Sequence, residues 1–328
     1  YLDYSANTPV DARVLKQFCA VERRCIGNAN SHHQAGSAAK AEIDAATIKI
    51  ASLLGVQPAE IIYTSGASEA NNFALKGLAL LSRHAGGDHG KRMVEKTDIS
   101  MDDPALEKAL DKHYRDRLKD EIDLLDVKQD GTVDLEHLKD LLRPDTICVA
   151  VTLVDSELGV VQPVQEIAAI LKAYPHCHLH VDATQAVGKI PVSFEGVDTM
   201  SLTAHKFYGL NGIGLLLKRR KLALEPLIHG GESTTIYRSG TPTVALAASL
   251  ETALEAAVGE LPARTARVKE ANAFLRDALS KYPKVHINSP ENAIPHILNL
   301  SVENVKGTAF QRELEDAAYR LGGRGASA

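Results

Sequence analysis

From residue 60 to residue 220, short apolar runs alternate with segments of helical periodicity, and this alternation restricts the fold more than any other feature of the chain. Runs such as 147–154 and 197–202 are rich in apolar residues, as is typical of strands that are buried on both faces. Between them, the segment 164–173 spaces its apolar residues as one face of a helix requires. We therefore predict an α/β fold, with a mostly parallel sheet sandwiched by helices.

Polar residues that can do chemistry follow several of the predicted strands. In an open parallel sheet a ligand binds beyond the carboxyl ends of the strands. A lysine at such an end is by itself about as often a salt-bridged residue, or one that buries only its alkyl chain, as a catalytic one. Here, however, four separate strand ends carry suitable residues, which favours a binding site: Ser68, Ser156, Asp182 and Lys206.

Two of these residues together indicate one cofactor. Asp182 ends the apolar sequence HVD, and Lys206 follows the next apolar run, in SLTAHKFYG. Pyridoxal 5′-phosphate (PLP) needs this pair, because a lysine amine forms a Schiff base with it while a carboxylate keeps its pyridinium nitrogen protonated. We therefore predict a PLP site between the two strand ends.

The segment 60–72 provides a candidate site for the phosphate group. A short strand leads into the turn Ser65–Gly66, and a helix is predicted from about Ser68 to Leu81. The free N–H groups and the positive end of the dipole at a helix N-terminus favour an anion. Serine and glycine also act as ordinary helix caps at such positions, so the pattern alone leaves both interpretations open.

The last third of the chain predicts a second, smaller α+β domain. Helices are predicted over 242–258 and 262–281, and a strand over 297–302. With 328 residues, the chain is long enough for one large domain and one small domain. The first residue is tyrosine rather than methionine, so we expect the natural N-terminus to lie upstream. The predicted boundaries are 13–259 for the large PLP-binding domain, and 1–12 with 260–328 for the small domain.

Composition argues against several other classes of protein. The net charge of −5 favours neither a nucleic acid nor an anionic membrane as partner. No apolar run approaches the roughly 20 residues of a membrane span, and no signal peptide is visible, so we expect a cytoplasmic protein. The adjacent histidines His32 and His33 have no third ligand nearby in sequence, and we predict no metal site. Cysteine spacing matches no zinc or redox motif, which predicts reduced thiols at Cys19, Cys25, Cys148 and Cys177.

The chain also resembles a known family. The motifs YLDYSANTPVD, TSGASEANN, DSELGVVQP, HVDATQAVGK, SLTAHKFYG and IYRSGTP occur in the order and spacing of the cysteine desulfurases. These enzymes form a branch of the class V aminotransferases, within the fold-type I PLP enzymes. The resemblance covers most of residues 1–260 and continues more loosely to about residue 315. It implies a PLP-dependent conversion of L-cysteine to L-alanine, with the sulfur passed to an enzyme thiol and then to an acceptor protein, as in iron–sulfur cluster assembly.

The resemblance assigns roles around the ring of the cofactor. It implies that Lys206 carries the cofactor, that Asp182 faces the pyridinium nitrogen, and that Gln185 faces the phenolic oxygen. Ser156 stands near cofactor and substrate, where the family more often has asparagine. Asn30 lies in the loop that approaches the substrate.

It also assigns the phosphate contacts. Ala67 contributes its N–H, and Ser68 stands where the family usually has threonine. Thr203 and His205 add further contacts from the strand before Lys206. Thr241 resembles the residue that reaches the neighbouring subunit's phosphate, which implies a homodimer.

Three departures from the family pattern affect the predicted activity. The family has a histidine that stacks on the cofactor ring, whereas the corresponding segment 98–104 has none, and His113 is the nearest candidate. The family's nucleophilic cysteine loop would follow residue 315, where no cysteine occurs. The arginine that binds the substrate carboxylate has only Arg320 and Arg324 as weak substitutes, and we expect the small domain to be incomplete at its C-terminus.

These departures leave alternatives to a cysteine desulfurase. A catalytically inactive relative could keep the fold and act as a binding protein in sulfur-carrier assembly. A related PLP lyase or aminotransferase could act on another amino acid.

Overall fold

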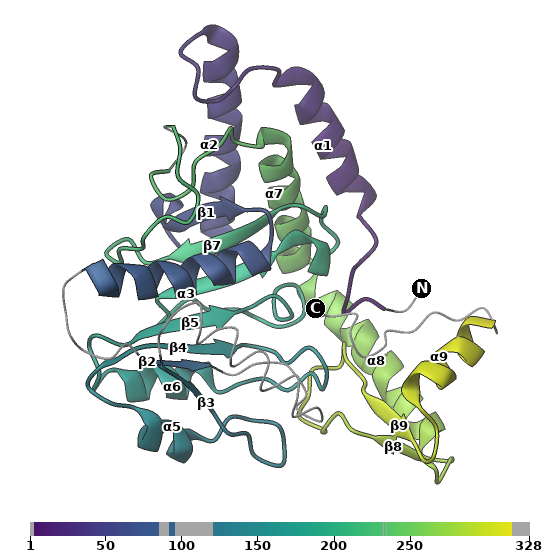
Figure 1. Ribbon diagram of the computed structural model, residues 1–328. Helices are drawn as coiled ribbons and strands as arrows, with labels where there is room; N and C mark the ends of the chain where they lie inside the picture. Colours follow the sequence, from purple (N-terminus) through teal and green to yellow (C-terminus); the bar gives the residue numbers. More distant parts are fainter. Residues whose placement is uncertain (1–2, 85–91, 96–120, 232, 234, 317–328) are drawn as a thin grey trace.

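At the centre of the computed structural model is a seven-stranded sheet with the order β1-β7-β6-β5-β4-β2-β3 (Figure 1). Neighbouring strands from β6 to β3 run parallel, whereas β7 is antiparallel to both β6 and β1. The predicted mostly parallel α/β fold is therefore confirmed. The strands are β1 (Ile61–Thr64), β2 (Arg92–Glu95), β3 (Glu121–Leu124), β4 (Thr146–Thr152), β5 (His178–Asp182), β6 (Thr199–Thr203) and β7 (Gly214–Lys218). The structure describes residues 3–84, 92–95, 121–231, 233 and 235–316.

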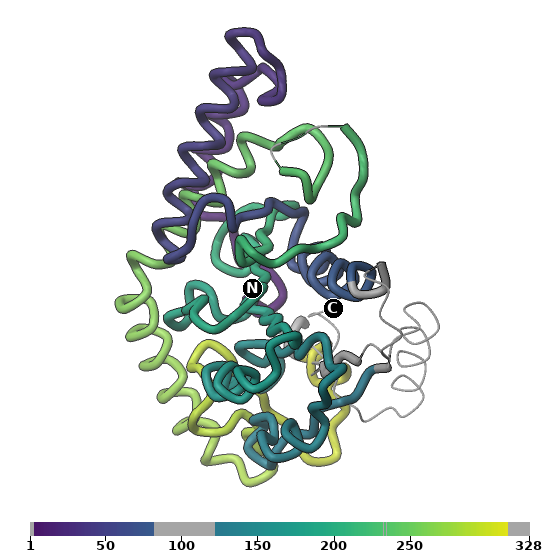
Figure 2. The backbone as a smooth tube through the Cα atoms, turned by 90° about the vertical axis from the view of Figure 1, so that its left-hand side faces the viewer, coloured from purple at the N-terminus to yellow at the C-terminus, as the bar shows by residue number. Residues whose placement is uncertain are grey.

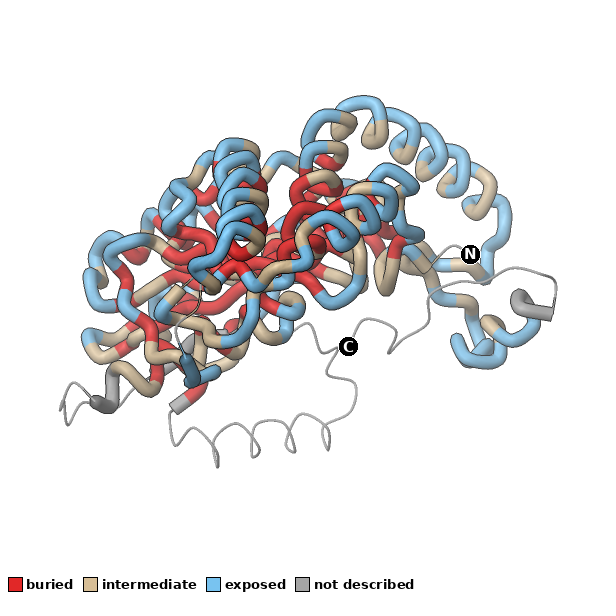
Figure 3. The backbone as a smooth tube through the Cα atoms, turned by 90° about the horizontal axis from the view of Figure 1, so that it is seen from above, coloured by how far each residue is buried: buried red, intermediate tan, exposed pale blue. Residues whose placement is uncertain are grey.

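Helices cover both faces of this sheet. In β7, Leu215 and Leu217 belong to one buried cluster, with residues of α6 and α7, whereas Leu216 belongs to another, with residues of α3. Because both faces are covered, successive residues of a strand can all be apolar, which explains the continuous apolar runs in the sequence. Figure 3 shows the buried residues concentrated between the exposed faces of the helices. The covering elements include α3 (Ala67–His84), α6 (Val164–Leu171) and α7 (Val244–Gly259), and the short turns are η1 (Pro58–Glu60) and η2 (Ala204–Lys206).

Aspartates cap the N-termini of two of the helices. The carboxylate of Asp11 accepts the N–H of Arg13 at 2.8 Å and caps α1 (Ala12–Arg24). Asp134 caps α5 (Leu135–Leu141) in the same way. Side-chain caps of this kind satisfy N–H groups that the first helical turn leaves unpaired. None of the described helices combines the length and the apolar character needed to cross a membrane.

The helix α2 (Gln34–Leu54) begins at a side-chain cap and ends at a glycine. Nδ1 of His33 accepts the N–H of Gly36 at its start. Gly55 follows its last residue with φ = 66°, a left-handed conformation that glycine adopts without strain. Together, α1 and α2 project from one end of the molecule (Figure 2).

The C-terminal part forms a separate small layer beside the main sheet (Figure 1). The helix α8 (Leu261–Leu279) leads into an antiparallel pair, β8 (Val285–Ile287) and β9 (Leu300–Val302), and α9 (Gly307–Asp316) follows. The strand predicted over 297–302 corresponds to β9. The partner β8 was not predicted, because its three residues include an exposed histidine and show no apolar run.

Candidate active site

Lys206 lies in the turn η2, directly after β6. Its amine donates hydrogen bonds to the carbonyl oxygens of Ser5, at 2.5 Å, and Ala6, at 2.9 Å. The N-terminal segment is held there because the N–H and the hydroxyl of Thr8 both donate to the His205 carbonyl, at 2.9 and 2.8 Å. Two segments that are distant in sequence therefore form one wall of the site.

The surroundings of Lys206 favour its neutral form. The side chain is buried, and burial lowers the pKa of Lys206 below the ordinary value for an amine. The carboxylates of Asp3 and Asp182 act in the opposite direction, but burial has the larger effect. Only a neutral amine is a nucleophile, so the lowered pKa favours the form of Lys206 that attacks a carbonyl carbon.

Asp182 ends β5, the strand that pairs with β6 in parallel. Its Oδ1 accepts the N–H of Thr184 at 2.8 Å, and its Oδ2 accepts the amide Nδ2 of Asn71 at 2.6 Å. Two donors fix the carboxylate from the helix side and from its own strand. These two hydrogen bonds hold the carboxylate in one orientation at the end of β5, where it could pair with a protonated ring nitrogen.

Asn71 belongs to a buried chain of hydrogen bonds that sequence reasoning missed. Its Oδ1 lies 3.0 Å from Nε2 of His180, whose Nδ1 lies 2.9 Å from the hydroxyl of Thr199. Burial lowers the pKa of His180 to about 4, so the ring is neutral at neutral pH, and Nε2 must donate because Oδ1 only accepts. The chain therefore fixes the Asn71 amide with its N–H group on Asp182. In the sequence, the only sign of this hydrogen-bond chain is that polar residues occur within apolar segments.

The start of α3 provides an anion site beside β6. Ala70 N–H donates to the Gly66 carbonyl at 3.1 Å, so the N–H groups of residues 67–69 precede the first helical hydrogen bond. The N–H of Ser65 is taken by Glu69 at 2.7 Å, and Glu69 also pairs with Arg238 at 2.9 Å. Ala67 and Ser68 therefore lie at the N-terminus of α3, and their contacts with a phosphate stay a prediction.

Thr203 and His205 stand next to this helix start. The hydroxyl of Thr203 lies 3.1 Å from Nδ1 of His205. A Cβ placed on Gly66 would be 3.6 Å from the same hydroxyl, which shows how near the turn lies to β6. Burial, followed by the charges of two nearby lysines, lowers the pKa of His205, so its ring is neutral near neutral pH.

Close contact between this turn and the sheet requires Gly214 on β7. A Cβ placed there would lie 2.6 Å from the Leu202 carbonyl oxygen and 2.8 Å from the Cα of Gly66. Both neighbours are backbone atoms, so neither can rotate away. We expect Gly214→Ala to destabilise the protein by about 1–3 kcal/mol and to weaken binding of anions at the turn. Urea denaturation and phosphate-binding measurements would check both effects.

A matched control is Gly259→Ala. Gly259 ends α7, and no atom lies within 4 Å of a Cβ placed on it. We expect this change to be neutral or mildly stabilising, because alanine favours the helical conformation. A Gly214→Ala protein as stable as the control would contradict the close packing of the turn against β7.

Gln185 joins the Lys206 cluster. Its amide Nε2 donates to the Ser5 carbonyl at 2.9 Å, the same oxygen that accepts from Lys206. The structure therefore brings Gln185 and Lys206 together at the Ser5 carbonyl, and the strand that ends in Asp182 pairs with the strand before Lys206. The predicted roles of the site residues toward cofactor and substrate stay predictions. Of the other residues assigned such roles, Ser156 is half-buried, whereas Asn30 and Thr241 are exposed.

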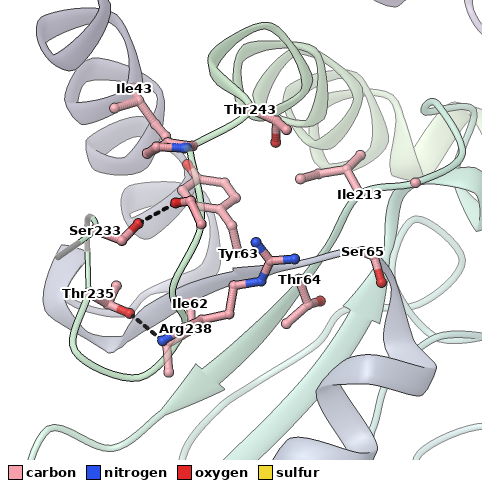
Figure 4. A pocket seen from close by; sticks show the side chains of 13 residues that line it. Ile43, Ile62, Tyr63, Thr64, Ser65, Ile213, Ser233, Thr235, Arg238 and Thr243 are labelled. Carbon is pink, nitrogen blue, oxygen red and sulfur yellow. Dashed lines mark hydrogen bonds between the residues drawn. The ribbon is translucent and has the colours of Figure 1, made fainter. Parts of the chain in front are cut away.

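A pocket opens beside the phosphate turn rather than over Lys206 (Figure 4). Its lining includes Tyr63, Ser65 and Arg238, together with residues of α2 and of the 233–243 loop, but neither Lys206 nor Asp182. The Arg238–Glu69 ion pair connects the wall of this pocket to the start of α3. We assign the chemistry to Lys206 and Asp182, because the lining of this pocket contains neither an amine nor a carboxylate.

The described residues fit PLP. A buried amine of lowered pKa, a doubly hydrogen-bonded carboxylate on the adjacent strand, and a helix N-terminus are the groups that the cofactor's aldehyde, ring nitrogen and phosphate need. The hydroxyl of Thr184 beside Asp182 is buried and has no hydrogen-bond partner within the described residues. A bound polar ligand would satisfy such a group.

Comparison with known proteins gives the family. The family model for aminotransferase class V matches residues 1–326. A relative from Dictyoglomus turgidum, named cysteine desulfurase IscS, is 36% identical over 319 residues, which are 96% of this chain and 78% of that protein. The chain belongs to the class V aminotransferase family, in its cysteine desulfurase branch.

Solved structures of the family have the same fold. One named NifS-like protein superposes with a TM-score of 0.90 at 33% identity, covering 100% of this chain and 88% of that one. Another, described as SspA in complex with cysteine, has a TM-score of 0.80 at 28% identity, covering 98% of this chain and 88% of that one. The predicted membership of the family is thereby confirmed.

The three departures from the family pattern fall on residues that the structure does not describe. The segment 98–104 and His113, the region after residue 316, and the two candidate arginines all lie there. All four cysteines are described, and none of them forms a disulfide bond. Burial, and then the charge of Asp198, raises the pKa of Cys177 to about 12, so this thiol is not a nucleophile at neutral pH.

Proposed function

We propose that the protein is a PLP-dependent cysteine desulfurase, which converts L-cysteine to L-alanine and passes the sulfur to a thiol. The observation that carries the proposal is the pairing of β5 and β6, which holds the carboxylate of Asp182 and the buried amine of Lys206 at neighbouring strand ends. The family relatives named cysteine desulfurase, and the neighbour described with cysteine bound, support L-cysteine as the substrate.

When bound, PLP withdraws electrons from the α-carbon of an amino acid. The chain supplies the groups around it. Lys206 would hold the cofactor and, as a free amine, would take the α-proton as a general base. Asp182, which accepts hydrogen bonds from Asn71 and Thr184, would face the ring nitrogen. The first turn of α3 would hold the phosphate through its N–H groups.

Other parts of the proposal concern assembly. Thr241 is exposed beside Gly240 and Pro242, which line the pocket of Figure 4, and this placement supports a contact with a second copy in a homodimer. The sulfur acceptor is a protein thiol, and iron–sulfur cluster assembly is the proposed use. Four described cysteines without a disulfide bond fit a reducing compartment such as the cytoplasm. The proposed domains are 13–259, and 1–12 with 260–328.

The test is incubation of the PLP-loaded protein with L-cysteine and a thiol reductant, measuring alanine and sulfide together. We expect equal amounts of both, in excess over enzyme. Parallel reactions contain L-selenocysteine, cysteine sulfinate, or an amino donor with a keto acid. Turnover in only one of these parallel reactions would show that its amino acid, and not L-cysteine, is the substrate. A PLP-loaded protein that releases no alanine would indicate the inactive binding protein instead.

A further inference from the structure

Lys189 is a second buried lysine close to Lys206. It follows β5 by one short turn, and only 8% of the residue is exposed. Its Nζ donates to Oε1 of Gln185 at 2.9 Å and reaches the Lys206 carbonyl oxygen at 3.5 Å. The family resemblance assigned a role to Gln185 and to Lys206 but none to Lys189.

The direction of these hydrogen bonds fixes the Gln185 amide. The amide nitrogen donates to the Ser5 carbonyl at 2.9 Å, an oxygen that can only accept. The amide oxygen is thereby turned to Lys189, whose ammonium form only donates. Because Lys206 donates to the same Ser5 oxygen, the amide connects the two lysines through one acceptor. Lys189 and Ser5 therefore hold the amide from both ends, and without Lys189 only the Ser5 carbonyl would fix it.

We propose that Lys189 is a positioning residue for the cofactor, which holds the Gln185 amide with its N–H groups toward the ring oxygen and places a positive charge beside Lys206. This inference rests on the proposed function, because it takes PLP as the ligand. An anionic ring oxygen needs a donor, and an amide that presented its own oxygen would repel it.

The charged groups around Lys189 support the same role. Burial, with the charge of Lys206 second, lowers the pKa of Lys189 to about 7. Its charge in turn acts on His205 and His296, and burial together with that charge lowers the pKa of His296 to about 4. No carboxylate pairs with Lys189 within the described part of the chain. A buried amine without a counter-ion is costly, and a bound anionic cofactor would supply the missing negative charge.

Lys189→Met removes both the donor and the charge while keeping the length of the side chain. The matched control is Lys218→Met. Lys218 is also buried, and its Nζ donates to the carbonyl oxygens of Leu222 and Arg219. It lies at the opposite end of β7 from Gly214, far from the site. Both substitutions delete a buried lysine, so both are expected to lower the stability of the protein. Only Lys189→Met is expected to change the absorbance titration of the cofactor and the affinity for PLP.

The measurement is a pH titration of the visible absorbance of the bound cofactor, together with PLP affinity of the protein stripped of cofactor. In Lys189→Met we expect the pKa of the absorbance change to rise by about one unit, because a nearby positive charge and a donor to the ring oxygen both disfavour protonation there. PLP affinity is expected to fall about tenfold. Lys218→Met is expected to match the wild type in the pKa of the absorbance change and in PLP affinity. Lys189→Gln, a milder change, is expected to shift both quantities in the same direction as Lys189→Met.

A double-mutant cycle with Gln185→Met tests whether Lys189 acts through the amide. If Lys189 acts through the amide, Lys189→Met lowers PLP affinity less in the Gln185→Met protein than in the wild type. Full additivity in the cycle, or a titration equal to wild type in both Lys189 variants, would overturn the inference. Wild-type protein that binds no PLP would instead refute the proposed function, so the two failures are distinguishable.

Discussion

Replacing Lys206 with alanine is expected to lower alanine formation from L-cysteine by about a thousandfold or more. The substitution removes both the covalent attachment of PLP and the general base that the reaction needs. The variant is expected to bind PLP without a covalent bond, so that its visible absorbance is lost on dialysis. Absorbance after dialysis, and alanine formation measured by amino-acid analysis, would check the two expectations.

The informative comparison is Lys206→Arg. A guanidinium fills similar space but stays charged, so it cannot attack a carbonyl carbon. We expect Lys206→Arg to be as inactive as Lys206→Ala while it still fills the space beside Ser5 and Ala6. Cofactor that survives dialysis in Lys206→Ala would mean that another amine carries it. Lys189, the neighbouring buried lysine, would then be the candidate.

Replacing Asp182 with asparagine is expected to reduce turnover by about a hundredfold or more, or about 3 kcal/mol in transition-state stabilisation. An amide cannot keep the ring nitrogen protonated as a carboxylate does. In addition, the side chain of Asp182→Asn would offer one acceptor oxygen where two donors, from Asn71 and Thr184, now converge. Steady-state kinetics with PLP in excess would separate lost turnover from weaker cofactor binding.

Asn71→Leu and Thr199→Val provide graded controls for Asp182. Asn71→Leu removes one of the two donors and leaves Asp182 itself intact, so we expect a loss intermediate between wild type and Asp182→Asn. Thr199→Val removes only the far end of the hydrogen-bond chain, and the bond between His180 and Asn71 remains. We therefore expect turnover to fall by less than about tenfold. Turnover of Asp182→Asn equal to wild type would contradict the role of the carboxylate.

Much of the fold was predictable because buried strands leave a direct record in sequence. The apolar runs ending at Asp182 and near Lys206 correspond to β5 and β6. The antiparallel direction of β7 could not be predicted in the same way. A continuous apolar run shows that both faces of a strand are covered, but it does not show in which direction the strand runs.

The supporting residues of the site were harder to predict than the residues they support. Asn71 and His180 are polar side chains whose partners lie 111 and 19 residues away, at Asp182 and Thr199. Lys189 reads as an ordinary surface residue in GKIP until its burial is known. Sequence spacing alone does not reveal such pairings, because they depend on how the helices settle on the sheet.

The N-terminal segment has a consequence for how the protein matures. Ser5 meets Lys206 across 201 residues of chain, so during synthesis this wall of the site cannot form until the ribosome has released β6. Contacts of such long range are late events in folding, since closing a large loop costs entropy before any bond compensates. Nascent protein would therefore meet its cofactor through an open side, and the early residues would close that side afterwards.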